Sequence, residues 1–365
     1  MTQYKLIMLL MVSLIFVWFC FLFPVKSISF SEPFSTKSAN MSSILSDRQK
    51  MTLNQYMIMA SCDAAYDGTN ITTDQLISVI STGCRFLDFQ VFHDDLLGPY
   101  IGYSTDPTFE QVKGIQTVLT FKNLLTTVAT NGFGGLVPNN MDPLFIHLRI
   151  KSKNTEVYKQ MAADIQNTIT SRLYLDKFGK AIQINKSTIM KNIMGKIIIV
   201  VDRSINPDYS IQQCGTLQSY DISGAVANSC VDLIKYVNIE TGGTNWRSIS
   251  YNPPPSVGCL TRGGTLSPLV DDSTNSLGIV MANNSSVELF LIYPPSTETT
   301  NADPVSASMY ISNLGCQTLL YRFYVQDSGF TWYSGLFQVY NTAFIPMGYA
   351  VNATSTVAIN TSALF

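Results

Sequence analysis

Hydrophobic runs of five to eight residues recur along the chain at spacings typical of buried β-strands. These runs occupy residues 56–61, 86–92, 99–104, 143–150, 196–202, 247–251, 287–294 and 318–325. Amphipathic stretches with helical spacing lie between several of them, at 72–84, 120–133 and 155–175, and Thr72 or Thr73 can cap the first. Eight strands with interleaved helices over about 300 residues predict an α/β fold, a distorted TIM-type (β/α)8 barrel.

A longer apolar stretch precedes this pattern. The segment Leu6–Val25 contains no charged residue and is flanked by Lys5 and Lys26. Its length matches the roughly 20 residues that a helix needs to cross a bilayer. We therefore expect one N-terminal transmembrane helix, retained as a membrane anchor. A cleaved signal peptide is the alternative, because Val25 and Ser27 are small enough to precede a cleavage site.

The pattern predicts four parts along the chain. Residues 1–26 are the anchor or signal peptide, and the serine-rich stretch 27–50, which lacks periodicity, is expected to be a polar stalk. The barrel is expected at 51–352, followed by a tail at 353–365. Within the barrel, a connecting loop at 204–235 joins a first half (51–203) to a second half (236–352).

Composition narrows the functional classes. Charged residues make up 13% of the chain, hydrophobic residues 46%, and the net charge is -2. This balance fits a large buried core together with a membrane segment. It gives no indication of a nucleic-acid partner or of a polybasic membrane patch.

Cysteines and glycosylation sequons bear on the compartment. Six cysteines follow the predicted anchor, and seven N-x-S/T sequons begin at Asn40, Asn70, Asn185, Asn283, Asn284, Asn352 and Asn360. Together they favour a glycoprotein domain on the lumenal, extracellular or outer-virion side of a membrane, or a secreted domain if the leader is cleaved. Cys214 and Cys230 bracket a short loop and are the best candidates for a disulfide. Reduced cysteines packed as small hydrophobic side chains are the alternative.

Several fragments follow the order found in one enzyme family. The runs "YMIMASCD", "DQLISVISTGCRFLDFQVF", "GPYIGYS" and "DPLFIHLRI" resemble the X region of phosphatidylinositol-specific phospholipase C. Later runs, with "IYP" and "GCQ" as the best short matches, resemble its Y region. The resemblance spans nearly all of 50–350. It implies a phospholipase C-like phosphodiesterase barrel with its active site at the carboxyl ends of the strands.

The resemblance also implies a chemistry, and this chain departs from it. In the family one histidine is the general base on the inositol 2-hydroxyl and a second protonates the leaving diacylglycerol oxygen, while carboxylate and amide oxygens hold calcium. At the matching positions the two histidines are Cys62 and Tyr103. The four calcium positions are Asp63, Asp88, Gln90 and Arg149. Tyr293, the ring expected beside the inositol, is kept.

Arg149 changes the expected site most. A fixed positive charge would repel a divalent cation, and we expect it to pair with Asp88 and Asp63 instead. We therefore expect no calcium and no other cofactor, and assign Arg149 and Tyr293 as candidate substrate-binding residues. A shifted alignment or an outward-pointing Arg149 is the alternative. His147 is expected to be structural, and His93 to lie in a solvated loop.

These observations predict a membrane-anchored phospholipase C-like protein that is catalytically inactive and acts as a structural or binding module. A virion membrane or capsid component would suit such a chain, with the membrane contacted through Leu6–Val25 and other membrane or capsid proteins as further partners. One alternative is an active phosphoric diester hydrolase that cleaves phosphatidylinositol-type lipids with a rebuilt, calcium-independent site. Another is a lectin-like or phosphoinositide-binding role.

Overall fold

The computed structural model describes residues 41–105, 115, 117–135, 137–152, 154–205, 209, 231–242, 246–250, 266–271, 276–281, 289–294 and 300–362. The predicted anchor Leu6–Val25 and the cysteines Cys214 and Cys230 lie outside this set. Within the described ranges, no helix is both long enough and apolar enough to span a bilayer.

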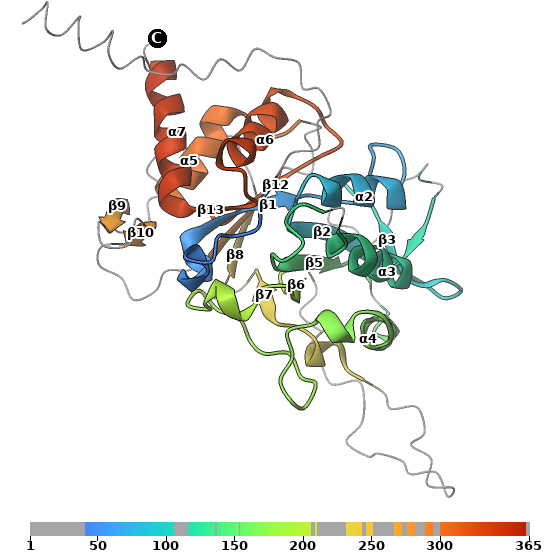
Figure 1. Ribbon diagram of the computed structural model, residues 1–365. Coiled ribbons are helices and arrows are strands. Elements are labelled where there is room, and N and C mark those ends of the chain that lie inside the picture. Colours follow the sequence, from blue (N-terminus) through green and yellow to red (C-terminus); the bar gives the residue numbers. More distant parts are fainter. Residues whose placement is uncertain are drawn as a thin grey trace, which may run out of the picture. The chain divides into compact units, whose positions relative to one another are not determined.

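Parallel strands form a nearly closed barrel (Figure 1). Neighbouring strands pair in the order β7-β6-β5-β2-β1-β12-β11-β8, and every pairing along this path is parallel. Their bounds are β1 (Tyr56–Ser61), β2 (Phe86–Asp94), β5 (Leu144–Ile150), β6 (Ile197–Asp202), β7 (Ile239–Thr241), β8 (Trp246–Ser250), β11 (Leu289–Tyr293) and β12 (Thr318–Tyr321). The predicted distorted TIM-type fold is confirmed at this level.

Among the described residues, five further strands lie outside the parallel path. They are β3 (Gly98–Gly102), β4 (Leu119–Thr120), β9 (Leu266–Asp271), β10 (Ser276–Met281) and β13 (Phe344–Pro346). The predicted barrel strand at 99–104 is β3, which pairs antiparallel with β2. Only three residues, 95–97, connect β2 to β3, and a parallel return needs a much longer crossover. The short strand β7 fills the eighth barrel position instead.

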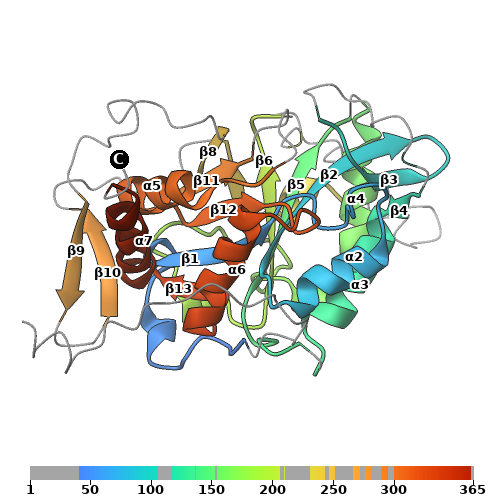
Figure 2. The ribbon, with the colours of Figure 1, turned by 90° about the horizontal axis from the view of Figure 1, so that it is seen from above.

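Two groups of helices cover the barrel (Figures 1 and 2). The first group is α2 (Thr73–Ser81), α3 (Phe121–Gly132) and α4 (Glu156–Thr168), and the second is α5 (Pro304–Leu314), α6 (Ser328–Tyr340) and α7 (Met347–Ser362). Short 3-10 helices are η1 (Arg48–Lys50), η2 (Leu53–Gln55), η3 (Thr170–Arg172), η4 (Met190–Asn192) and η6 (Leu233–Lys235). The predicted cap of α2 is confirmed, because the Thr72 side chain accepts a hydrogen bond from the Gln75 amide.

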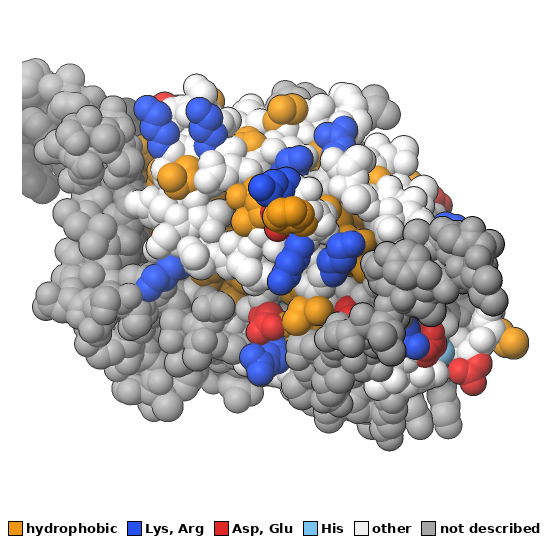
Figure 3. All heavy atoms as spheres, turned by 90° about the horizontal axis from the view of Figure 1, so that it is seen from below, with side chains coloured by type: hydrophobic (Ala, Val, Ile, Leu, Met, Phe, Trp, Pro, Cys, Tyr) orange, Lys and Arg blue, Asp and Glu red, His pale blue; other side chains and the backbone are white. Residues whose placement is uncertain are grey.

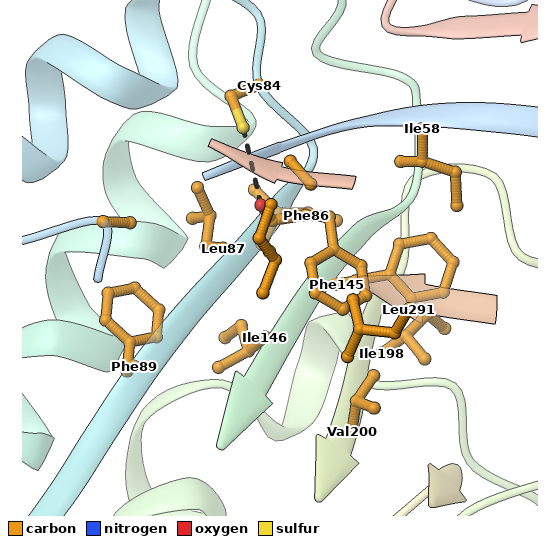
Figure 4. Packing of buried hydrophobic residues seen from close by; sticks show 14 of the residues in the cluster. Ile58, Cys84, Phe86, Leu87, Phe89, Phe145, Ile146, Ile198, Val200 and Leu291 are labelled. Atoms are coloured by element: carbon orange, nitrogen blue, oxygen red, sulfur yellow. Dashed lines mark hydrogen bonds between the residues drawn. The ribbon is translucent and has the colours of Figure 1, made fainter. Parts of the chain in front are cut away.

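The strands bury both faces, which explains their continuous hydrophobic runs. All six residues of β1 and all six of β6 are buried. Inside the barrel, the side chains of Phe86, Phe145, Ile198 and Leu291 pack together (Figure 4). Trp246 packs edge-on against both Phe86 and Phe145. A core of this size fixes the strand ends, and therefore the side chains that follow them.

The domain is longer at both ends than the sequence predicts. Residues 41–50, assigned to the polar stalk, pack against the barrel: Met41 and Ile44 are buried, and the Ile44 amide donates to Asp142 Oδ1 at 2.8 Å. At the other end, α7 continues to Ser362, through most of the stretch expected to be a tail. The segment 41–50 lacks a periodic pattern and has only three hydrophobic residues, of which Met41 and Ile44 are buried and Leu45 is exposed.

The described cysteines lie in the core. Cys62, Cys84 and Cys316 are all buried, and the thiols of Cys62 and Cys84 are free. These side chains pack as small hydrophobic groups. The disulfide expected between Cys214 and Cys230 lies outside the described residues. Burial raises the pKa of the Cys84 thiol to about 12, so it stays protonated at neutral pH.

Candidate active site

The candidate site lies where the carboxyl ends of several barrel strands meet. Asp88 lies beside His147 in the register of β2 and β5, and Gln90 lies beside Arg149. Because strand side chains alternate with a period of two, Asp88, Gln90, His147 and Arg149 share one face of these strands. Asp63 joins them just beyond the end of β1, through the hydrogen bonds described next.

Arg149 is held by two carboxylates. Its Nε donates to Asp88 Oδ1 at 2.9 Å, and its Nη2 donates to Asp88 Oδ2 and, at 2.7 Å, to Asp63 Oδ1. The Arg149 side chain is 12% exposed, and that of Asp88 is fully buried. A two-point bond between a guanidinium and a carboxylate fixes the direction of both groups. The expected pairing of Arg149 with Asp88 and Asp63 is confirmed.

Asp63 owes its position to an unusual backbone. Its φ of 46° lies in the left-handed region, which non-glycine residues seldom adopt. Its amide donates to Asp88 Oδ2 at 3.1 Å, and its carboxylate accepts from Gln90 Nε2 at 2.9 Å. Gln90 is itself fixed by Ser104, whose amide donates to Gln90 Oε1. Gln90 therefore directs a donor, not an acceptor, toward Asp63.

The charges of this group follow from burial and pairing. Burial lowers the pKa of Arg149, but Asp88 and Asp63 outweigh it and hold that pKa well above its ordinary value. Burial raises the pKa of Asp88, yet Arg149 and His147 bring it below its ordinary value. For Asp63 burial dominates and raises the pKa, although Arg149 opposes it. Arg149 and Asp88 therefore form a charged pair, with Asp63 as the more easily protonated third member.

These residues do not fit calcium. Ligand atoms of Cys62, Asp63 and Asp88 lie within 4.8 Å of one another, which gives a small oxygen and sulfur cluster. However, both carboxylates already accept hydrogen bonds from Arg149, whose charge opposes a divalent cation. Burial, followed by the charges of Asp63 and Asp88, raises the pKa of Cys62 well above its usual value, and a neutral thiol is a poor ligand for a hard cation.

The positions of the family's two histidines hold groups that titrate far from neutrality. Cys62 lies in the cluster, with its Sγ 3.4 Å from Asp63 Oδ2. Tyr103 is half-buried and stacks on Tyr66 with ring centroids 4.0 Å apart. Burial raises the pKa of Tyr103 above its ordinary value, and a hydrogen bond with Tyr324 opposes this only in part. Neither group is a general acid or base suited to pH 7.

His147 is part of the site, although its role was expected to be structural. Its Nδ1 lies 2.8 Å from Asp88 Oδ1 and its Nε2 lies 2.8 Å from Thr241 Oγ1, and the residue is fully buried. Because an ionised Asp88 can only accept, Nδ1 donates to it, and Nε2 faces the Thr241 hydroxyl. An imidazole oriented by a carboxylate and facing a hydroxyl is a familiar arrangement in catalysis.

Asp202 and Thr241 are site residues that the sequence did not reveal. The Tyr293 hydroxyl donates to Asp202 Oδ2 at 2.7 Å and lies 3.3 Å from His147 Nε2. The guanidinium carbon of Arg149 lies 5.4 Å from the centroid of the Tyr293 ring. Asp202 had a usable signal, because it is the acidic residue that ends the buried run "IIIVVD". Thr241 belongs to a three-residue strand and had none.

His93 lies outside this group. It belongs to β2, and its side chain is only 5% exposed, so the expectation of a solvated loop histidine is wrong. Its Nδ1 lies 3.3 Å from Asn154 Nδ2. The strand extends further than predicted because β3 returns beside it and covers its end.

Known structures share this barrel. The crystal structure of PLC21 from L. pealei superposes with a TM-score of 0.54 at 15% identity, over 82% of this chain and 37% of that one. The barrel is a phospholipase C-like fold. PLC21 from S. officinalis gives the same TM-score and coverage at 16% identity. The phosphatidylinositol-specific phospholipase C from Listeria monocytogenes matches 84% of this chain and 98% of its own, at 13% identity and a TM-score of 0.41.

The phospholipase C-like barrel is similar to only part of those larger chains, since it spans 37% of the PLC21 proteins. No family model matches its sequence, and no curated protein matches it. The relationship is therefore one of fold, and the activity has to be argued from the site itself.

Proposed function

We propose that this chain is a noncatalytic phospholipase C-like barrel that serves as a binding or structural module. The observation that carries the proposal is the ion pair of Arg149 with Asp88 and Asp63. A guanidinium in this place satisfies the carboxylates internally. The site then has no need of a metal ion for its own stability.

Electrostatics support this proposal. Two unit charges 4 Å apart in a poorly solvated protein site interact by about 4 kcal/mol, so Arg149 opposes each charge of an incoming cation by roughly that amount. The cation would also have to displace hydrogen bonds from a guanidinium whose pKa is held well above its ordinary value. Lowering the pH would not make the site available to a cation, because protonation of Asp63 would remove a carboxylate ligand.

The absence of suitable proton-transfer groups at Cys62 and Tyr103 is the second support. A positioned general base and a positioned general acid each contribute about 10²–10⁴ in rate. Burial raises the pKa of both the thiol and the phenol. A phosphodiester bound as in the family would find no base at Cys62 to activate a hydroxyl and no acid at Tyr103 to protonate the leaving oxygen.

Membrane association is the remaining part of the proposal. The uncharged segment Leu6–Val25 has the length of a bilayer-spanning helix and supports an anchored module. A membrane or capsid component of a virion is the setting in which we propose that such a module acts.

The direct test is turnover by the purified full chain. We expect no release of inositol phosphates from phosphatidylinositol or phosphatidylinositol bisphosphate in mixed micelles, either with calcium or with EDTA. Turnover that calcium stimulates and EDTA abolishes would contradict both the noncatalytic proposal and the internal ion pair as its reason.

One observation favours an active, metal-independent phosphodiesterase as a second candidate. His147 is oriented by Asp88 and faces the Thr241 hydroxyl, and Arg149 donates to the same carboxylate oxygen that His147 contacts. Burial of the His147 ring counts against this second candidate, since the hydroxyl that reacts must reach His147 Nε2. Turnover that resists EDTA and is lost in His147→Gln would establish this candidate, whereas turnover lost in Tyr103→Phe would indicate a site rebuilt around the phenol.

A further inference from the structure

The segment that joins α4 to β6 lies across the amino-terminal ends of the barrel strands. We call residues 172–196 the basal segment. Just before β1, the Leu53 amide donates to Thr188 O, and the Ala181 amide donates to Lys235 O just before β7. The basal segment is therefore at the end of the barrel opposite the candidate active site, which lies at the carboxyl ends of the strands.

Positive charge is concentrated in the basal segment. It contains one acidic residue and six basic ones, namely Arg172, Lys177, Lys180, Lys186, Lys191 and Lys196, in a chain whose net charge is -2. The single acid, Asp176, is occupied by hydrogen bonds from the amides of Phe178 and Lys180. Lys177, Lys180 and Lys191 are exposed, so their charges face solvent. The rest of the molecule is correspondingly acidic.

Exposed hydrophobic side chains accompany these cations. Phe178 is 78% exposed, and Lys177 Nζ lies 4.9 Å from the centroid of its ring. Ile189 is also exposed. On the side where α4 lies, a space-filling view shows Lys and Arg side chains gathered around hydrophobic ones (Figure 3). Lysines around a protruding aromatic ring are typical of protein surfaces that contact the headgroup region of a bilayer.

The N-terminal chain enters the domain at the same end. Met41 is buried, and the Ile44 amide donates to Asp142, which precedes β5. The chain between Val25 and Met41 can extend over at most about 55 Å. A bilayer that received the apolar segment Leu6–Val25 would therefore be within reach of the basal segment.

We propose that the basal segment docks on an anionic lipid surface through Lys177, Lys180, Lys191 and Phe178. Docking in this orientation directs the candidate active site away from the lipid. The attraction is electrostatic at its onset, so it weakens as the screening length falls from about 10 Å at 0.1 M salt to about 3 Å at 1 M. The proposal does not depend on whether the site catalyses a reaction.

Lysine acetylation on vesicles tests this contact with the full chain. The protein is reconstituted with vesicles of phosphatidylcholine alone or of phosphatidylcholine and phosphatidylserine in equal parts, treated with a water-soluble acetylating ester and digested for mass spectrometry. We expect acetylation of Lys177, Lys180 and Lys191 to be roughly threefold slower or more on the anionic vesicles. Lys122, an exposed lysine on α3, should react equally on both, and 1 M salt should remove the protection.

Two matched variants distinguish the two ends of the barrel. Phe178→Ala should reduce the protection of the three lysines. Leu96→Ala, which removes a 95% exposed side chain from the tip of the β2–β3 hairpin beyond the carboxyl-terminal end of β2, should leave it unchanged. Both side chains project into solvent, so neither substitution is expected to alter folding.

Several outcomes overturn the proposal. Equal acetylation of the three lysines on both kinds of vesicle removes its basis. If Leu96→Ala loses the protection of the three lysines and Phe178→Ala keeps it, the opposite end of the barrel docks on the vesicle. Protection by duplex DNA but not by vesicles reassigns the surface to nucleic acid. A glycan on Asn185, which is exposed within the basal segment, would block the contact and place the segment away from any bilayer.

Discussion

Arg149 and Asp88 are joined by two parallel hydrogen bonds, from Nε to Oδ1 and from Nη2 to Oδ2. Both partners are largely shielded from bulk water, since the Asp88 side chain is fully buried and that of Arg149 is only 12% exposed. Buried pairs of this kind are costly to break from one side, because the remaining charge keeps its desolvation penalty and loses its partner.

Removal of this guanidinium should have two effects. In Arg149→Gln, Asp88 and Asp63 lose their cation, and the free energy of unfolding should fall by about 3–5 kcal/mol in EDTA. The vacated carboxylates should then bind a divalent cation, so millimolar calcium should raise the melting temperature of the variant but not of the wild type. Thermal unfolding with EDTA and with calcium measures both effects.

Arg203→Gln is the matched control for that experiment. Arg203 pairs with Glu240 at 3.4 Å, but its side chain is 56% exposed. Loss of such a surface pair should change the free energy of unfolding by no more than about 1 kcal/mol, with no response to calcium. If Arg149→Gln behaves like this control, the site is not held together by the ion pair.

The His147 network should show coupling. His147→Phe leaves Asp88 Oδ1 and the Thr241 hydroxyl without a hydrogen bond that they now make, and should cost about 2–4 kcal/mol of stability. Thr241→Val removes only the hydroxyl and should cost about 1 kcal/mol. Denaturant unfolding of both single variants and the double variant measures the coupling. Strict additivity would mean that the two side chains do not interact.

Stability should depend on pH through Asp142. Burial raises the pKa of this carboxyl from 3.8 to about 6, although the hydrogen bond from the Ile44 amide opposes the shift. A group whose pKa is raised by folding stabilises the protein below its unfolded pKa, and this contribution is lost as pH rises through the folded value. Relative to Asp142→Asn, the wild type should therefore lose about 2 kcal/mol between pH 4 and pH 7.

The same pH series contains a control of opposite sign. Burial slightly opposes ionisation of Asp67, but hydrogen bonds from Asn70 and Thr69 hold its pKa below the ordinary value. Asp67→Asn should therefore change stability more at neutral than at acidic pH, through loss of a favourable charge. Equal pH profiles for the wild type and Asp142→Asn would show that Asp142 ionises normally.

Close packing at Gly329 should make this position intolerant of a side chain. A Cβ added at Gly329 would lie 2.3 Å from Ala302 O, a backbone atom that cannot move aside easily. We expect Gly329→Ala to cost about 1–3 kcal/mol, as overpacked positions do. At Gly135 an added Cβ meets no atom within 4 Å, so Gly135→Ala should have little effect. Chemical denaturation of the two variants compares them directly.

The hydrophobic pattern predicted the buried strands best. Strands such as "YMIMAS" and "IIIVVD" are buried on both faces, and a continuous apolar run is the direct result. The pattern failed at β7, whose three residues "IET" are too few to show a run, and at β3, where the hairpin connection decides the pairing. Helices α5 and α6 were missed because apolar residues lie on most of their faces, so the helical period is weak.

Only part of the candidate site could be predicted from the sequence. Arg149 could be assigned to Asp88 and Asp63 because the family resemblance places all three residues at the calcium positions of one site. The connections of His147 to Thr241 and of Tyr293 to Asp202 cross between strands distant in sequence. Likewise, a net charge of -2 concealed the basal segment, since a whole-chain sum cannot show where charges gather.

The pairing of β1 has a consequence for synthesis on the ribosome. This strand is completed by β12 and β13, and the Ala60 amide donates a hydrogen bond to the hydroxyl of Tyr333, which lies 273 residues further along the chain. Until those last elements have emerged, β1 presents an open edge of the kind that joins other chains. Closure of the barrel therefore waits until β12 and β13 have been synthesised, and a chain that stops before them leaves this edge of β1 unpaired.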